Sequence, residues 1–200
     1  AKTPLPDALQ FAVNLKDTKL LKNMRSQLSE IVKHKVPYGY IKKIYPVGAW
    51  DEHCKEGVAR YLPLTTLLWW IEELRCPGVE KLITERLAKG EAPTFGYGKL
   101  MERLMYCSSQ RSSVLSSLVP VAQQSIAQYS MPLRTPMAVL GDCSGSMQVA
   151  VRTSSIIVSL MAALGNAKLF FFNNKCVKPP FVPTSIKEVL MISEEIIADG

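Results

Sequence analysis

The sequence PMAVLGDCSGSM, residues 136–147, carries the clearest structural pattern in the last third of this 200-residue chain. Met137–Gly141 is a short apolar run between a proline and a polar turn, which predicts a buried β-strand. Met147–Leu164 follows as a long, nearly uncharged run rich in Val, Ile, Leu and Ala, which predicts a helix too apolar for a surface position. The polar residues between them therefore lie between the carboxyl end of a strand and the N-terminus of a helix.

A second strand and a second helix follow in the sequence. Ala167–Phe172 (AKLFFF) predicts a strand that ends at Asn173-Asn174, and Thr184–Ala198 has the apolar spacing of an amphipathic helix. The order strand, helix, strand, helix predicts a parallel sheet with right-handed crossovers. We therefore predict an α/β domain over residues 136–200.

The turn after the first strand carries a pattern of oxygen ligands. Asp142 supplies a carboxylate, Ser144 and Ser146 supply neutral hydroxyls two residues apart, and Gly145 allows a tight turn on which they converge. In open α/β sheets, ligands bind outside the carboxyl ends of the strands. Mg²⁺ prefers such hard oxygen ligands and needs few protein carboxylates when a partner supplies another anionic oxygen. The sequence therefore predicts a metal site at Asp142, Ser144 and Ser146.

The strand, the string DCSGSM at residues 142–147 and the long helix after it resemble the metal-ion-dependent adhesion site of the von Willebrand factor A (vWA) family. The resemblance implies a Rossmann-like fold, with Ser144 and Ser146 binding Mg²⁺ or Mn²⁺ directly and Asp142 directly or through water. In that family a Thr on a later loop and a further acidic residue complete the site. No Thr in this chain takes that role, since Thr184 precedes the last predicted helix. We therefore expect residues 136–200 to be the N-terminal portion of a vWA domain, truncated at residue 200.

Catalytic interpretations of the same turn fit less well. The string GDCSG at residues 141–145 matches neither the Gly-Asp-Ser-Gly string of trypsin-like proteases nor a Gly-x-Ser-x-Gly elbow, because Cys143 is inserted. A Cys143 nucleophile would need a His base, and His34 and His53 both lie in the preceding region. We expect Cys143 to pack into the sheet or line the turn, and we expect the protein not to be an enzyme.

Residues 1–135 have the sequence pattern of an all-α domain. Apolar residues recur at three- and four-residue steps after Thr18, a candidate N-cap, and predict a helix that ends near Lys35. Helix stops are expected at Gly78 and Gly90. A repeated step from an apolar residue to proline, which suits the first turn of a helix, occurs at Pro37, Pro63, Pro93 and Pro120. This spacing predicts stacked helix pairs, as in an α-solenoid, with an irregular helical bundle as the alternative.

An apolar block with two tryptophans lies inside this region. Leu67, Leu68, Trp69, Trp70 and Ile71 are expected to form its core, because large aromatic side chains dominate core energetics. The alternative is a platform on which nucleic-acid bases stack, which would need exposed rings with Arg or Lys beside them.

The positive charge of the chain is concentrated in the helical region. Residues 1–135 hold 19 Lys and Arg against 12 Asp and Glu, whereas residues 136–200 hold five of each. A basic surface attracts nucleic acid or an acidic protein, and candidate RNA-binding residues are Lys16, Lys19, Lys22 and Arg25. The alternative is that these residues line the solvated face of a helix. A basic helical region followed by a vWA domain also loosely resembles the TROVE family of Ro-type ribonucleoproteins, which implies RNA binding by the helices.

Composition limits the remaining classes. The longest apolar runs fall short of the roughly 20 residues that span a bilayer, and the five scattered cysteines form no zinc-binding motif. Scattered cysteines are typical of a reducing compartment, so we expect a cytoplasmic protein with no membrane partner. The predicted function is a metal-dependent protein interaction module whose partner supplies an acidic residue, with RNA binding as the alternative.

Overall fold

The computed structural model describes residues 7–17, 24–128, 137–164 and 167–199, and it divides into two compact units, residues 1–94 and 95–200. The predicted domain boundary at 135/136 lies outside the described residues and stays a prediction. Up to residue 128 the described chain is helical and contains no strand, as the sequence predicted. No helix in the described ranges has the length and apolar character needed to cross a membrane.

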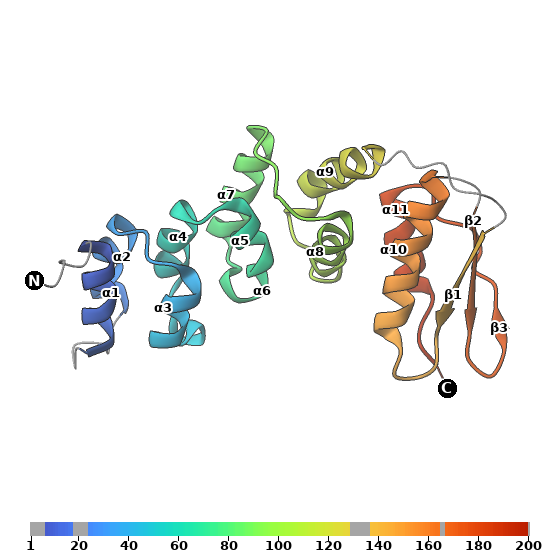
Figure 1. Ribbon diagram of the computed structural model, residues 1–200, viewed down its shortest axis with the longest axis horizontal. Helices are drawn as coiled ribbons and strands as arrows, with labels where there is room; N and C mark the ends of the chain where they lie inside the picture. Colours follow the sequence, from blue (N-terminus) through green and yellow to red (C-terminus); the bar gives the residue numbers. More distant parts are fainter. Residues whose placement is uncertain (1–6, 18–23, 129–136, 165–166, 200) are drawn as a thin grey trace, which may run out of the picture. The chain divides into compact units, whose positions relative to one another are not determined.

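The first unit is a series of short helices (Figure 1). Helix α2 packs against α4, and α4 packs against α7. Shorter helices connect and cover these, with α5 packed on both α6 and α7. The helices of this unit are α1 (Asp7–Asp17), α2 (Met24–Lys33), α3 (Tyr38–Ile44), η1 (Val47–Ala49), α4 (Glu52–Tyr61), α5 (Leu64–Trp69), α6 (Ile71–Leu74) and α7 (Pro77–Ala88).

Proline and glycine mark the helix ends only in part as predicted. Pro37 and Pro63 stand at the N-caps of α3 and α5, and Gly90, with φ +85°, follows the end of α7. The other two prolines contradict the prediction of a repeat. Pro93 lies in a segment without regular secondary structure, and Pro120 lies inside α9 (Leu115–Ala127), where it costs that helix one backbone hydrogen bond.

The structure contradicts one further predicted helix end, at Gly78, and confirms another, near Lys35. Gly78 is the second residue of α7 and not a helix stop, and a Cβ at this position would overlap the side chain of Glu56. The Glu56 side chain of α4 therefore occupies the space that a side chain at residue 78 would fill. Helix α2 ends at Lys33 and the chain turns at Lys35, with φ +48°, close to the predicted end. The candidate N-cap Thr18 lies outside the described residues.

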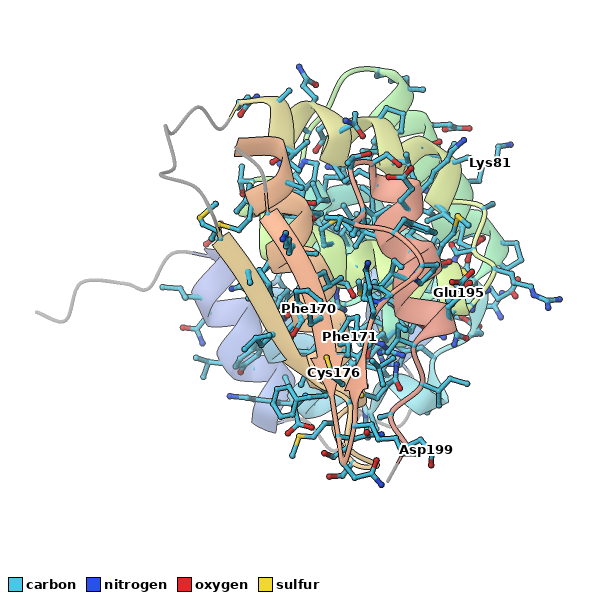
Figure 2. The ribbon with its side chains drawn as sticks, turned by 90° about the vertical axis from the view of Figure 1, so that its right-hand side faces the viewer. Lys81, Phe170, Phe171, Cys176, Glu195 and Asp199 are labelled. Atoms are coloured by element: carbon cyan, nitrogen blue, oxygen red, sulfur yellow. The ribbon has the colours of Figure 1, made fainter. Side chains whose placement is uncertain are left out.

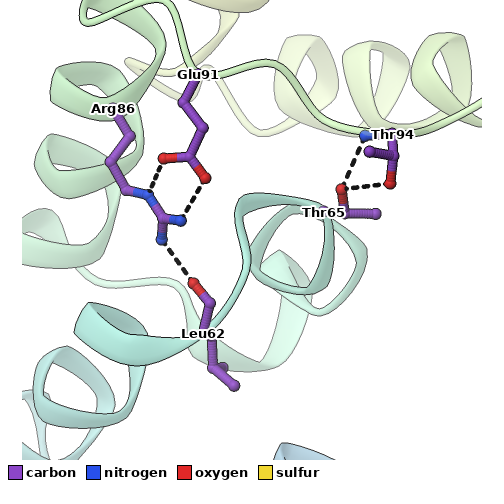
Figure 3. A network of polar contacts seen from close by, with 5 residues as sticks. All are labelled: Leu62, Thr65, Arg86, Glu91 and Thr94. Atoms are coloured by element: carbon purple, nitrogen blue, oxygen red, sulfur yellow. Dashed lines mark hydrogen bonds and ion pairs between the residues drawn. The ribbon is translucent and has the colours of Figure 1, made fainter.

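The connections of the first unit are held by a polar network (Figure 3). Arg86 binds both carboxylate oxygens of Glu91, at 2.6 Å from Nε and 2.5 Å from Nη2, and donates to the carbonyl of Leu62 at 2.7 Å. The Thr65 hydroxyl accepts from the backbone N–H of Thr94 at 2.8 Å. These bonds join the start of α5 to the segment after α7.

The tryptophan block belongs mainly to the core. Leu67, Leu68 and Ile71 are fully buried, whereas Trp69 and Trp70 are half-buried. The ring of Trp70 is covered by the Lys42 ammonium, which lies 3.5 Å from the ring centroid. That ammonium also binds Glu73 at 3.0 Å. Because a protein side chain already occupies a face of Trp70, the arrangement favours the core interpretation over base stacking.

The second unit combines a helical layer with a three-stranded mixed sheet. Strand β1 (Met137–Asp142) pairs in parallel with β2 (Ala167–Phe172), as predicted, and β2 pairs in antiparallel orientation with the short β3 (Cys176–Val177), which the sequence analysis missed. Figure 1 shows α10 (Gln148–Leu164) and α11 (Ile186–Glu195) along the same face of the sheet. Helices α8 (Tyr97–Ser109) and α9 pack on one another and on α10.

The sheet has one buried and one open face. Leu169 and Phe171 of β2 lie in the core with Val151 and Val158 of α10. Alternate residues point the other way, and among them Leu140 of β1 is 66% exposed. The Tyr97 hydroxyl of α8 is hydrogen-bonded to that of Ser159 at 2.8 Å, which ties the helical layer to α10.

Candidate metal site

The site is built on the carboxyl end of β1. Asp142 is the last residue of that strand and is in register with Phe172 of β2. The ladder extends one residue further, because the Cys143 N–H donates to the Phe172 carbonyl at 2.8 Å. A tight turn follows, in which the Met147 N–H donates to the Ser144 carbonyl at 2.7 Å, and α10 begins at Gln148. The strand, turn and helix therefore lie where they were predicted, but the strand is not buried as predicted, because Ala138 and Leu140 are exposed on the open face of the sheet.

Close packing fixes the end of the strand. An added Cβ at Gly141 would lie 2.6 Å from the Ser154 hydroxyl of α10 and 2.7 Å from the ring of Phe171. Real Cβ atoms do not approach other heavy atoms so closely, so only glycine fits here. Gly141 therefore lets α10 pack directly onto β1, one residue before the candidate ligand Asp142.

Asp142 is held as a carboxylate. Its Oδ1 accepts from the Ser144 N–H at 2.8 Å. Hydrogen bonding by the side chain and the backbone N–H of Ser144 lowers the pKa of Asp142 below its usual value. Among the described residues no Lys, Arg or His forms an ion pair with Asp142. Its negative charge is therefore present at neutral pH and is not neutralised by a basic side chain of the described chain.

The other two predicted ligands lie on the same turn. Ser144 is half-buried, and Gly145 and Ser146 are exposed. One carboxylate and two hydroxyls thus lie on one solvent-accessible turn before the N-terminus of α10. Hard oxygens of this kind suit Mg²⁺ or Mn²⁺, which keep water molecules in the remaining positions. In the described ranges, no three His, Cys, Asp or Glu side chains are grouped so that they could hold a metal ion, so a metal here would depend on the serine hydroxyls.

Cys143, between the ligands, points into the core. It is 2% exposed and packs in the cluster that contains Val151, Leu169 and Phe171. Burial raises the pKa of its thiol, which keeps the thiol protonated at neutral pH. The expectation that Cys143 packs into the sheet is confirmed.

A second segment borders the site, and the sequence analysis did not identify it. The Asp199 N–H donates to the Cys143 carbonyl at 2.9 Å, and the Asn173 side-chain amide donates to the Asp199 carbonyl at 2.8 Å. Figure 2 shows Asp199 at the end of the sheet toward which the arrows of β1 and β2 point. A cavity of about 440 Å³ lies here, lined by Cys143, Asn173 and residues 195–199, among others. Asn173 directly follows the predicted strand Ala167–Phe172, so the carboxyl-end rule could have singled it out.

The four candidate RNA-binding residues are not brought together as a site by the described structure. Lys19 and Lys22 lie outside the described residues, and Lys16 lies in α1, where its side chain is not described. Arg25 on α2 is exposed and forms an ion pair with Asp51 at 3.1 Å. The role of these residues stays a prediction.

Comparison of the sequence with protein-family models and with curated proteins found no match. The geometry of the turn after β1 is therefore the ground on which a function is assigned.

Proposed function

We propose that this protein is a non-catalytic interaction module that binds a partner protein through a divalent metal ion held by Asp142, Ser144 and Ser146. The observation that carries the proposal is the position of these three residues on one turn, between the carboxyl end of a parallel strand and the N-terminus of α10. The likeness of the DCSGSM turn to the vWA metal site, noted from the sequence, supports the same assignment.

The charge of the site favours an acidic partner. Asp142 contributes one negative charge, and Ser144 and Ser146 contribute none. A divalent ion bound here would keep a net positive charge and coordination positions that an oxygen from outside can fill. The Asp142 carboxylate, with its lowered pKa, holds the ion across the neutral range, while the exposed Ser146 leaves the turn open to a partner. We infer that a carboxylate of the partner protein completes the coordination.

The proposed cellular compartment of the protein follows from its free cysteines. Cys54, Cys76, Cys107 and Cys143 are free and buried, and Cys176 is free and exposed. Free cysteines of this kind are typical of a reducing compartment. We therefore place the protein in the cytoplasm.

RNA binding by the helical region remains the alternative from the sequence. The excess of basic residues that supports this alternative is smaller in the first structural unit than in residues 1–135. Residues 1–94 hold 15 Lys and Arg against 11 Asp and Glu. In addition, Arg25 is already paired with Asp51. No feature of the described helices favours RNA over an acidic protein surface.

The open coordination position can be tested with a small carboxylate. Mn²⁺ bound to the full chain should enhance water proton relaxation, and propionate, which mimics an acidic side chain, should reduce this enhancement by displacing bound water. Propionamide, which has the same shape without the charge, should have little effect. Ser146→Ala should weaken Mn²⁺ binding, whereas Ser29→Ala, at an exposed position of α2, should leave it unchanged. Equal effects of propionate and propionamide would contradict the proposed carboxylate partner.

A further inference from the structure

Gln148, the first residue of α10, connects the metal-binding turn to the chain that follows α11. Its side-chain carbonyl Oε1 accepts from the Ala198 N–H at 3.0 Å. Its side-chain Nε2 lies 3.4 Å from the carbonyl oxygens of both Ser193 and Ile196. One side chain therefore reaches three backbone groups that lie 45 to 50 residues further along the chain.

One of these three backbone groups, the Ser193 carbonyl, lies on a buried residue, whereas Ile196 and Ala198 are half-buried. The last four carbonyls of a helix have no acceptor role within it, and Ser193 is in the last turn of α11 and buried. Ala198 lies after the helix, in a segment without regular structure. Because water has little access to the buried Ser193 carbonyl, the amide of Gln148 gives that carbonyl a partner and also bonds to the backbone of Ile196 and Ala198.

The same segment is bonded to the metal-binding turn itself. Asp199 donates from its backbone to Cys143, which lies between Asp142 and Ser144. Asn173 holds the Asp199 carbonyl from the end of β2. Gln148, two residues after Ser146, bonds to Ile196 and Ala198 of this segment, while Asn173 bonds to Asp199.

We propose that Gln148 is a positioning residue of the metal site, which couples the turn at residues 142–146 to the segment at residues 196–199. The inference rests on the proposed function, because it assumes that the turn binds a metal ion. Through this coupling, metal binding orders the segment, and the ordered segment in turn raises metal affinity by the same factor.

The first test is metal affinity in the full chain. Gln148→Met keeps the length of the side chain and removes its three polar contacts. We expect this variant to bind Mn²⁺ about tenfold more weakly, in the range typical for loss of an outer-shell partner, as measured by electron paramagnetic resonance of free Mn²⁺. Gln123→Met, at an exposed position of α9, is the matched control and should bind like the wild type. Asn173→Ala offers an independent second variant and should also weaken binding.

The second readout separates positioning from a purely structural role. In the wild type, Mg²⁺ should slow hydrogen exchange at the amides of Ala198 and Asp199, and in Gln148→Met this effect of Mg²⁺ should disappear while the helices stay protected. If Mn²⁺ affinity and the effect of Mg²⁺ on exchange are both unchanged in Gln148→Met, the inference is wrong although the proposed function stands. If the wild type itself binds no Mn²⁺, the proposed function fails first.

Discussion

At the scale of single residues, the candidate site depends on side chains whose roles differ in kind. Asp142 carries the charge, Ser144 shapes the turn through its hydrogen bond to Asp142, and Cys143 anchors the turn in the core. Gly141 has no side chain, which allows the Ser154 hydroxyl and the ring of Phe171 to pack closely against the strand. The ligands can therefore lie on an exposed turn because the residues beside them are closely packed.

Gly141 gives a prediction about stability. Gly141→Ala forces a Cβ into contacts of 2.6–2.7 Å with two buried neighbours, and overpacking of this kind costs about 1–3 kcal/mol. We expect the free energy of unfolding to fall by that amount in urea titrations. Gly98→Ala in α8, where nothing lies within 4 Å of the added Cβ, should be neutral or stabilising by about 0.5–1 kcal/mol. A Gly141→Ala variant as stable as Gly98→Ala would show that the strand and α10 do not pack as described.

At the scale of elements, the structure shows which sequence patterns are sufficient to predict a strand or a helix. The apolar runs at Met137–Gly141 and Ala167–Phe172 became β1 and β2 within one residue, and α10 begins one residue after its predicted start. Helix α11 is shorter than the predicted Thr184–Ala198, because residues 196–199 leave the helix and bond instead to Cys143, Gln148 and Asn173. Strands β1 and β2 and helix α10 have uniform apolar runs bounded by polar residues, so their hydrophobic pattern is enough to define them. The short β3 could not be predicted, because a two-residue strand carries no periodicity and depends on its partner β2.

The helical region shows where local signals fail. Proline precedes α3 and α5 but lies within α9. A proline is compatible with the start of a helix and, at the cost of one hydrogen bond, with its interior, so proline alone does not define a helix end.

The segment at residues 196–199, which borders the candidate site, was also missed in the sequence analysis. Gln148 acts through backbone groups of residues 193–198, which no local pattern connects to it.

Arg86 gives a prediction at the scale of elements. Its guanidinium is largely buried and joins α7 to Glu91 and to the Leu62 carbonyl at the end of α4. Hydrogen bonds to charged groups contribute about 1.5–3 kcal/mol, so Arg86→Met should lower the free energy of unfolding by roughly that amount. Arg60→Met, at an exposed position of α4, should change it by less than about 0.5 kcal/mol. Similar values for the two variants in thermal or urea unfolding would show that the network does not stabilise the unit.

At the scale of the whole molecule, the chain consists of a helical unit and a unit that carries the sheet and the candidate site. Helices α8 and α9, which follow the helical pattern of the first unit, pack with α10 and α11 beside the sheet. The sequence analysis grouped α8 and α9 with residues 1–135 because a helical pattern reports only local conformation. The division of the chain into compact units depends on contacts between distant segments. The candidate site lies wholly within the second unit.

Titration of Mn²⁺ into the full chain, followed by calorimetry, tests whether the turn after β1 binds a divalent metal ion. We predict one Mn²⁺ site per chain that Mg²⁺ displaces, that disappears in Asp142→Ala, and that is retained in Asp7→Ala, which removes an exposed carboxylate from the first turn of α1. Loss of the site in Asp142→Ala alone would assign the metal to the turn after β1. Absence of saturable binding in the wild type, or equal binding in both variants, would contradict the account.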